Sequence, residues 1–140
     1  SYTLNFTSET ALTRSSDGKA YELSASSDLA PTSFAGLTAA IDIYGYSNVE
    51  GGFEGFARLA FSTASSGTFY GNLTLPFNYT YLKVGPREGR LNATANNTIY
   101  GSVNVSYIFH FLTVSSGYFV GEERFSNGVV ESRWGTFSVN

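Results

Sequence analysis

The sequence predicts an all-β protein, and three of its features carry that prediction. Apolar and polar residues alternate over several stretches, which is the period of a half-buried strand. Turn-forming dipeptides separate these stretches, and no segment has the length and 3.6-residue period of a helix. About ten short strands with regular turns are typical of a sandwich or a barrel. We expect a single Ig-like or pilin-like β-sandwich, with a closed antiparallel β-barrel as the alternative.

The first seven residues predict a strand. Tyr2, Leu4 and Phe6 share one of its faces, and the polar residues between them, Asn5 included, share the other. Such a strand fits two positions: the first strand of its own domain, or a donor strand that inserts into a groove of a neighbouring subunit. We expect the second, with residues 1–8 as a donor strand or tail and residues 9–140 as the sandwich head domain.

The middle of the chain predicts a series of strands. Residues 10–25 indicate a hairpin that turns at Asp17-Gly18, because this dipeptide favours the positive φ angles of a type I′ turn. Residues 24–34 predict a loop or an edge, and Pro76 is expected to interrupt the pattern between two strands. The other strands that the alternation predicts cover residues 37–43, 53–63, 69–75, 77–84, 91–95 and 99–107.

Residues 108–114 are apolar on both faces, unlike the strands before them. Such a run is typical of a strand covered on both sides, or of one that enters a subunit contact. It contains His110, the only histidine of the chain. A lone histidine in an apolar strand is usually a packed residue, so we expect no catalytic role for His110.

The last hairpin can be specified by its register. Asn127-Gly128 predicts a two-residue loop, and that loop places opposite charges across from one another on one face. We expect these charges to be exposed and structural, with the ring of Trp134 covering the bare backbone of a glycine. The expected pairs are Arg124 with Glu131, Glu122 with Arg133, Phe125 with Val130, and Gly121 with Trp134.

The composition agrees with an extracellular location, which we expect for this protein. The chain has no Cys, so neither disulfide bonds nor thiolate metal sites are available, and stability depends on a core to which 12 Phe and 10 Tyr contribute. It also has no Met, so we expect Ser1 to be the residue left after removal of a signal peptide. No apolar run is long enough to span a bilayer. With a net charge of −3 and no basic patch, the chain is not expected to bind nucleic acid.

Six N-x-[ST] tripeptides form the most conspicuous motif. On a strand, the Asn and the Ser or Thr of such a tripeptide point to one side, and the middle residue points to the other. The middle residues are mostly apolar, so each site indicates a strand with an outer face that could carry an N-linked glycan. Strands rich in Ser, Thr and Asn also produce this tripeptide without glycosylation. The six acceptors are Asn5, Asn72, Asn78, Asn92, Asn96 and Asn104.

Residues that could carry chemistry are few. One His and no Cys give neither a metal site nor a Ser-His triad with its nucleophile motif. Asp42, between Ile41 and Ile43, would be an outward residue of a sandwich or a buried acid inside a barrel. We expect no enzyme, and no catalytic, metal or cofactor site beyond the glycans.

The whole chain resembles the glycosylated archaeal thread pili. The resemblance lies in its lack of Cys, its low charge, its Ser, Thr, Asn and Tyr content, its acceptor tripeptides and the detached segment Ser-Tyr-Thr-Leu-Asn-Phe-Thr. It implies a structural subunit of an extracellular surface filament, assembled head to tail with its own copies by donor-strand complementation. It also implies roles in adhesion to other cells or surfaces and in biofilms.

A second class of function remains open. Aromatic-rich strands and a possible interior acid at Asp42 would suit a secreted or biosynthetic barrel that binds or cyclises a small apolar ligand, similar to the allene-oxide-cyclase and dirigent barrels or to a lipocalin. A secreted lectin is a third option, because exposed Tyr and Trp can stack on sugars.

Overall fold

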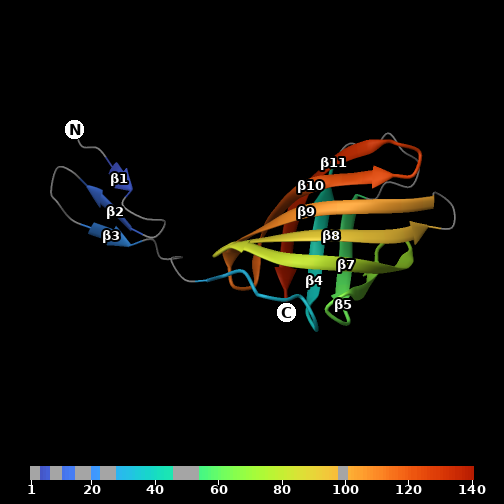
Figure 1. The fold of residues 1–140 in the computed structure, drawn as a ribbon, viewed down its shortest axis with the longest axis horizontal. Helices are drawn as coiled ribbons and strands as arrows, with labels where there is room; N and C mark the ends of the chain where they lie inside the picture. Colours follow the sequence, from blue (N-terminus) through green and yellow to red (C-terminus); the bar gives the residue numbers. More distant parts are fainter. Residues whose placement is uncertain (1–3, 7–10, 15–19, 23–27, 46–53, 98–100) are drawn as a thin grey trace.

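Most of the chain forms one closed barrel. The computed structural model describes residues 4–6, 11–14, 20–22, 28–45, 54–97 and 101–140. The barrel strands are β4 (Thr38–Tyr44), β5 (Gly55–Phe61), β6 (Ser66–Tyr70), β7 (Thr74–Gly85), β8 (Glu88–Asn97), β9 (Gly101–Thr113), β10 (Ser116–Phe125) and β11 (Val130–Val139). They pair in the order β10-β11-β4-β5-β6-β7-β8-β9, all antiparallel, and β9 pairs with β10 to complete the circle (Figure 1).

The prediction of an all-β fold is confirmed, in the form of the closed antiparallel barrel. The Ig-like or pilin-like sandwich is not confirmed, because a sandwich keeps unpaired strand edges, whereas each strand from β4 to β11 has a hydrogen-bonded neighbour on both sides. The length of the strands is one reason why the sheet closes into a barrel. β7 has 12 residues and β9 has 13, so the strands are long enough to tilt and bend into a closed sheet.

β7 runs through Pro76, where the sequence predicted an interruption. Pro76 is the third residue of β7, its side chain is exposed, and it lies opposite Thr68 of the short strand β6. A proline, which has no N–H to donate, is tolerated at the start of a strand. Residues 74–75 therefore belong to the same strand as residues 77–84, whereas residues 71–73, which the sequence placed inside a strand, form the turn between β6 and β7.

The N-terminal segment forms a small sheet of its own. Its strands are β1 (Leu4–Phe6), β2 (Ala11–Arg14) and β3 (Ala20–Glu22). They pair with one another in this order and with none of the described barrel strands (Figure 1). Residues 4–6 pair with residues 12–14 of the same chain. Tyr2 and the Asp17-Gly18 turn lie outside the described residues, and only the backbone of Leu4 and Phe6 is described, so donor-strand insertion stays a prediction.

Aromatic side chains fill one half of the barrel interior, and several of them lie over glycines of neighbouring strands. A Cβ atom on such a glycine would come within 2.4 to 2.8 Å of a ring carbon, so the glycine makes room for the ring. Gly121, which the sequence placed under Trp134, is covered by Tyr107 instead. The pairs are Phe77 over Gly67, Tyr81 over Gly89, Tyr107 over Gly121, and Phe119 over Gly135.

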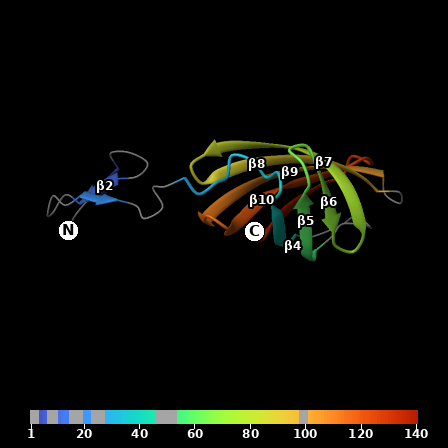
Figure 2. The same cartoon turned by 90° about the horizontal axis from the view of Figure 1, so that it is seen from below.

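Residues 28–37 close the aromatic end of the barrel before the chain enters β4. Phe34 is fully buried there, and its ring lies 4.1 Å from that of Tyr81 and 4.9 Å from that of Phe61. The Tyr81 hydroxyl donates a hydrogen bond of 2.8 Å to the carbonyl of Pro31. In Figure 2 this segment is the blue-to-cyan stretch that leads into β4. The predicted loop at residues 24–34 is thus, from residue 28, a plug for the barrel.

The last hairpin has a register one residue away from the predicted one. The N–H of Gly128 donates to the carbonyl of Phe125, and the N–H of Phe125 donates to the carbonyl of Val129, so the loop has three residues instead of two. Gly128, with φ of +90°, occupies the left-handed position that ends such a loop. Asn127 has no positive φ, which a type I′ turn would require. Because side chains alternate, this shift turns the predicted partners to opposite faces.

The observed pairs across this hairpin are Gly121 with Arg133, Glu122 with Ser132, Glu123 with Glu131, Arg124 with Val130, and Val120 with Trp134. Glu131 and Arg133 are buried inside the barrel, contrary to the expectation of an exposed charge ladder. Glu122 and Arg124 face outward and form an ion pair of 3.1 Å with each other.

Candidate functional site

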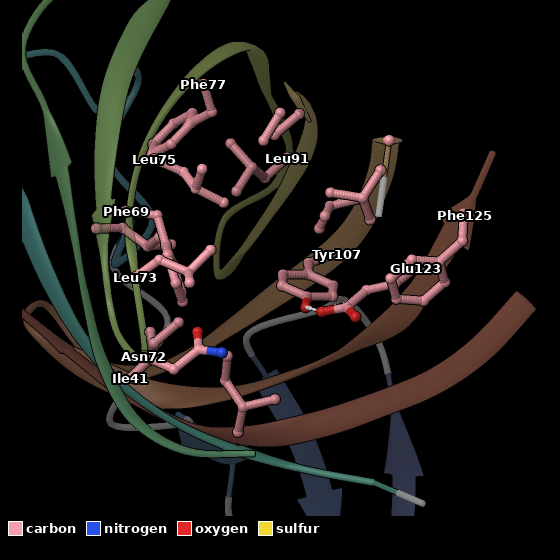
Figure 3. Close-up of a pocket in the computed structure, with 17 residues that line it drawn as sticks. Ile41, Phe69, Asn72, Leu73, Leu75, Phe77, Leu91, Tyr107, Glu123 and Phe125 are labelled. Atoms are coloured by element: carbon pink, nitrogen blue, oxygen red, sulfur yellow. Dashed lines mark hydrogen bonds between the residues drawn. The ribbon is translucent and has the colours of Figure 1, made fainter. Parts of the chain in front are cut away.

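The half of the barrel away from Phe34 contains a cavity of about 120 Å³ (Figure 3). Apolar side chains from β4 to β10 line it. The space exists because interior residues are smaller at this end: β9 carries Val103 and Val105 here, but Phe109 and Phe111 at the other end. The lining includes Asn72 and Gly101, which are exposed, so the cavity reaches the protein surface between the ends of the strands.

Polar side-chain groups reach the cavity from three residues, Asn72, Tyr107 and Glu123. Tyr107 of β9 and Glu123 of β10 are both buried, and the Tyr107 hydroxyl donates a hydrogen bond of 2.6 Å to Oε1 of Glu123. Figure 3 shows the two side chains pointing toward each other, with Phe125 beyond them. The Tyr107 hydroxyl and the Glu123 carboxylate therefore form one polar wall within an apolar lining.

Arg133 of β11 holds the other side of this polar group. Its side chain is fully buried, Nε donates to Oε2 of Glu123 at 3.3 Å, and Nη2 donates to Oε2 of Glu131 at 2.5 Å. Nη1 lies 3.7 Å from Oε1 of the half-exposed Glu54 and has no hydrogen-bond partner among the described residues. One guanidinium is thus shared by three carboxylates.

The hydrogen bonds give Glu123 the role of acceptor, and Tyr107 stays neutral. Each oxygen of Glu123 accepts a hydrogen bond, one from a phenol and one from a guanidinium, which is the arrangement of a carboxylate. Burial raises the pKa of Tyr107 well above its usual value, and the nearby negative charge and hydrogen bond of Glu123 raise it further, while Arg133 opposes them. Tyr107 is therefore a donor toward Glu123 and keeps its oxygen lone pairs as acceptors.

The sequence did not identify this site. It assigned Arg133 and Glu131 to the outer face, and it did not single out Tyr107 or Glu123 as site residues. The sequence did contain a signal: Glu131 and Arg133 are spaced two residues apart in step with Gly135 and Phe137, so all four lie on the same face of β11, and this face is buried. The signal was missed because the loop was predicted with two residues instead of three, which placed Glu131 and Arg133 on the outer face.

Asp42 and His110 both lie on the outside of the barrel. Asp42 accepts a hydrogen bond from the Tyr44 hydroxyl at 2.5 Å, so it is the outward strand residue and not an interior acid. His110 stacks on Tyr118 with ring centroids 4.6 Å apart, and its Nδ1 lies 3.8 Å from Oε1 of Glu88. His110 is thus packed, on the outer face.

Three of the acceptor tripeptides lie as the alternation predicted, whereas Asn72 lies in the turn between β6 and β7 and not on a strand. Asn78, Asn92 and Asn104 are exposed on the outside of β7, β8 and β9, while their middle residues point inward. Thr94 is the Cα partner of both Asn78 and Asn104, and its hydroxyl donates a hydrogen bond of 2.8 Å to Oδ1 of Asn104. Asn72 and Asn96 are exposed as well, and only the backbone of Asn5 is described. Glycosylation of these residues stays a prediction.

Comparison with protein-family models, with curated proteins and with solved structures found no match to this chain. The described residues contain no helix long and apolar enough to cross a membrane. The same part of the chain holds no cluster of His, Cys, Asp or Glu that could bind a metal ion. The class of protein that the geometry defines is a closed eight-stranded antiparallel barrel with an apolar cavity and one buried polar wall.

Proposed function

We propose that the barrel binds a small apolar molecule inside its cavity, which is the second class of function that the sequence left open. The observation that carries this proposal is the cavity itself. It is lined by aliphatic and aromatic side chains, it reaches the surface at one end, and the plug around Phe34 closes the other end. Ligand sites of this kind are concave and mostly apolar, with a few polar groups that orient the ligand.

The size of the cavity indicates the size of the ligand. An engineered cavity of about 150 Å³ lined by apolar side chains stays dry and binds benzene. A cavity of about 120 Å³ therefore suits a ligand with one ring, or with a short branched chain. Long fatty acyl chains would not fit without a change in the barrel.

Filling the cavity tests this proposal. Ala93 lines it, so Ala93→Leu should abolish binding of toluene, measured by NMR chemical-shift changes, and should leave the free energy of unfolding equal or higher. Ala40→Leu is the matched control, because Ala40 is exposed on the outside of β4. The proposal would be contradicted if the chemical-shift changes caused by toluene came from residues outside the cavity, or if they persisted in Ala93→Leu.

An extracellular filament subunit is the second candidate, and one observation favours it. A row of outward residues crosses the barrel and is largely apolar, although it faces solvent. Leu82, Val120, Trp134 and Tyr44 in this row are 63, 41, 50 and 46% exposed. The row is formed by Leu82, Arg90, Ile108, Val120, Trp134 and Tyr44, each the Cα partner of the next.

Residues 108–114, of which Ile108 belongs to this row, were predicted either to be covered on both sides or to enter a subunit contact. Leu112 and Val114 are 62% and 68% exposed, so this part of the chain is not covered on both sides by its own barrel. The exposure of these apolar side chains supports the other prediction, entry into a subunit contact, because exposed apolar patches are typical of interaction sites. The donor-strand form of assembly has less support, since the described barrel offers no unpaired edge to a strand from a neighbour.

Light scattering with electron microscopy tests the filament. Self-association should be lost in Val120→Thr/Trp134→Thr and retained in Phe56→Thr, because Phe56 is 82% exposed on β5 but lies outside the row. A wild-type protein that stays monomeric at all concentrations would exclude assembly through this row.

A further inference from the structure

The polar wall of the cavity specifies the chemistry of the ligand more closely than its apolar lining does. This step rests on the proposed binding function. Both polar groups that the wall presents, the Glu123 carboxylate and the Tyr107 oxygen, are hydrogen-bond acceptors, because the Tyr107 proton is already donated to Glu123. A ligand group placed against this wall must therefore be a donor.

Glu123 has capacity left for such a donor. A carboxylate offers about four lone-pair sites, and the observed hydrogen bonds from Tyr107 and Arg133 use two of them. A third donor from the cavity side would complete the coordination of Glu123 without displacing either protein partner.

The charges around Arg133 decide between a neutral and a charged donor. Among the described residues, the buried Glu123 and Glu131 share the guanidinium of Arg133, so these three side chains carry a formal charge of −1, and the half-exposed Glu54 adds negative charge at the edge of the network. In the low-dielectric interior this excess favours a cation and opposes an anion. Arg133 does not compensate a ligand carboxylate, because it is not part of the cavity lining: its Nε and Nη2 are bonded to Glu123 and Glu131, and its Nη1 faces Glu54.

We propose that the cavity binds a small apolar primary amine, with the ammonium group on Glu123 and the hydrocarbon part among the apolar side chains. Leu73, Leu75 and Val105 lie in the lining and would contact the hydrocarbon. The ligand is recognised by the shape of one ring or short chain and by one positive hydrogen-bond donor.

Four probes of nearly equal size test this inference: benzylamine, benzyl alcohol, toluene and benzoate, each titrated into the wild-type protein at neutral pH by calorimetry. Benzylamine should bind about tenfold more tightly than toluene, since a hydrogen bond to a charged group adds that much affinity. Benzyl alcohol should lie between them, and benzoate should bind more weakly than toluene. Competition with toluene shows that benzylamine occupies the cavity.

Two variants locate the recognition at Glu123. Glu123→Gln should remove the advantage of benzylamine over toluene. Glu122→Gln is the matched control: Glu122 is next in the chain, faces outward and pairs with Arg124, so the advantage should persist. If Glu123→Gln does not fold, Glu123→Asp replaces it: its side chain is one methylene shorter and draws the carboxylate back from the cavity, so the advantage of benzylamine should shrink, and an unchanged advantage would contradict the inference.

The outcomes separate the two proposals. Benzoate or toluene binding as tightly as benzylamine would overturn the amine inference and leave the apolar binding function intact. An equal loss of benzylamine and toluene binding in Glu123→Gln would also overturn it, because Glu123 would then act on the cavity and not on the ammonium group. Absence of binding by all four probes would overturn both.

Discussion

The Tyr107 hydroxyl donates a hydrogen bond of 2.6 Å to Glu123 across neighbouring strands inside the barrel, at the boundary between the aromatic core and the cavity. Tyr107 lies directly opposite Gly121, two residues before Glu123. The absence of a side chain at Gly121 lets the Tyr107 ring lie over the β10 backbone, and its hydroxyl thereby reaches the carboxylate. One glycine thus positions the polar wall of the cavity.

Tyr107→Phe should lower the free energy of unfolding by about 1 to 3 kcal/mol, because it leaves a buried carboxylate oxygen without its donor. Urea unfolding measures the change. Tyr118→Phe is the control: Tyr118 is 42% exposed on the outer face, so its variant should stay within about 0.5 kcal/mol of the wild type. Equal stabilities for Tyr107→Phe and the wild type would show that this hydrogen bond has no net value.

Arg133→Met should be more harmful than any change to the outer ion pair. It leaves Glu123 and Glu131 buried without their cation, which costs about 3 to 5 kcal/mol of unfolding free energy. Adding Glu123→Gln and Glu131→Gln should recover most of that loss, since the uncompensated charges are then gone. Arg124→Met, at an exposed pair, should cost no more than about 1 kcal/mol. A triple variant as unstable as Arg133→Met would contradict the electrostatic explanation.

Stability should fall as the pH rises above the range in which unfolded tyrosines ionise, at about 10. Burial raises the pKa of Tyr81 to about 12 and raises the pKa of Tyr107 well above its usual value, so the folded protein keeps protons that the unfolded chain releases. The contribution of these groups is complete below pH 10 and is lost as the pH rises through the folded pKa values. Urea midpoints at pH 9 and pH 11 measure the loss, which should be smaller in Tyr81→Phe. An unchanged midpoint at pH 11 would refute the shifts.

A disulfide tests the register of the last hairpin. Glu122 and Ser132 are Cα partners on the outer face, so Glu122→Cys/Ser132→Cys should oxidise within one molecule, as shown by the mass and by free-thiol assay. With the two-residue loop first expected from the sequence, these side chains would lie on opposite faces and no such bond could form. The chain has no other Cys, and Glu122→Cys alone controls for bonds between molecules.

Glycosylation should be visible in the intact mass of protein from its natural source, which should exceed the 15.1 kDa of the polypeptide. Asn78→Gln, Asn92→Gln and Asn104→Gln should each remove one glycan, because each of these side chains is exposed on the barrel. Asn127→Gln should change nothing, since Asn127 is exposed but lies in no acceptor tripeptide. A mass equal to that of the polypeptide would remove the strongest argument for an extracellular location.

The sequence by itself determined the class of the fold and most of its strands. Alternation is a local property, so the inward direction of Ile41, Ile43, Leu59 and Val105 can be read from the residues on either side. It also placed Asn78, Asn92 and Asn104 on the outer face correctly. None of these assignments depends on which strand lies beside which.

Only the tertiary structure decided whether the sheet closes, which charges lie inside, and where space is left. Closure depends on the pairing of β4 with β11, which lie far apart in the chain, whereas every other pair of barrel strands is consecutive. The hairpin loop differed by one residue from the expected one, and because side chains alternate with a period of two, that difference moved Arg133 from the surface to the interior. The cavity, in turn, depends on the sum of side-chain volumes from seven strands, β4 to β10, which no local pattern contains.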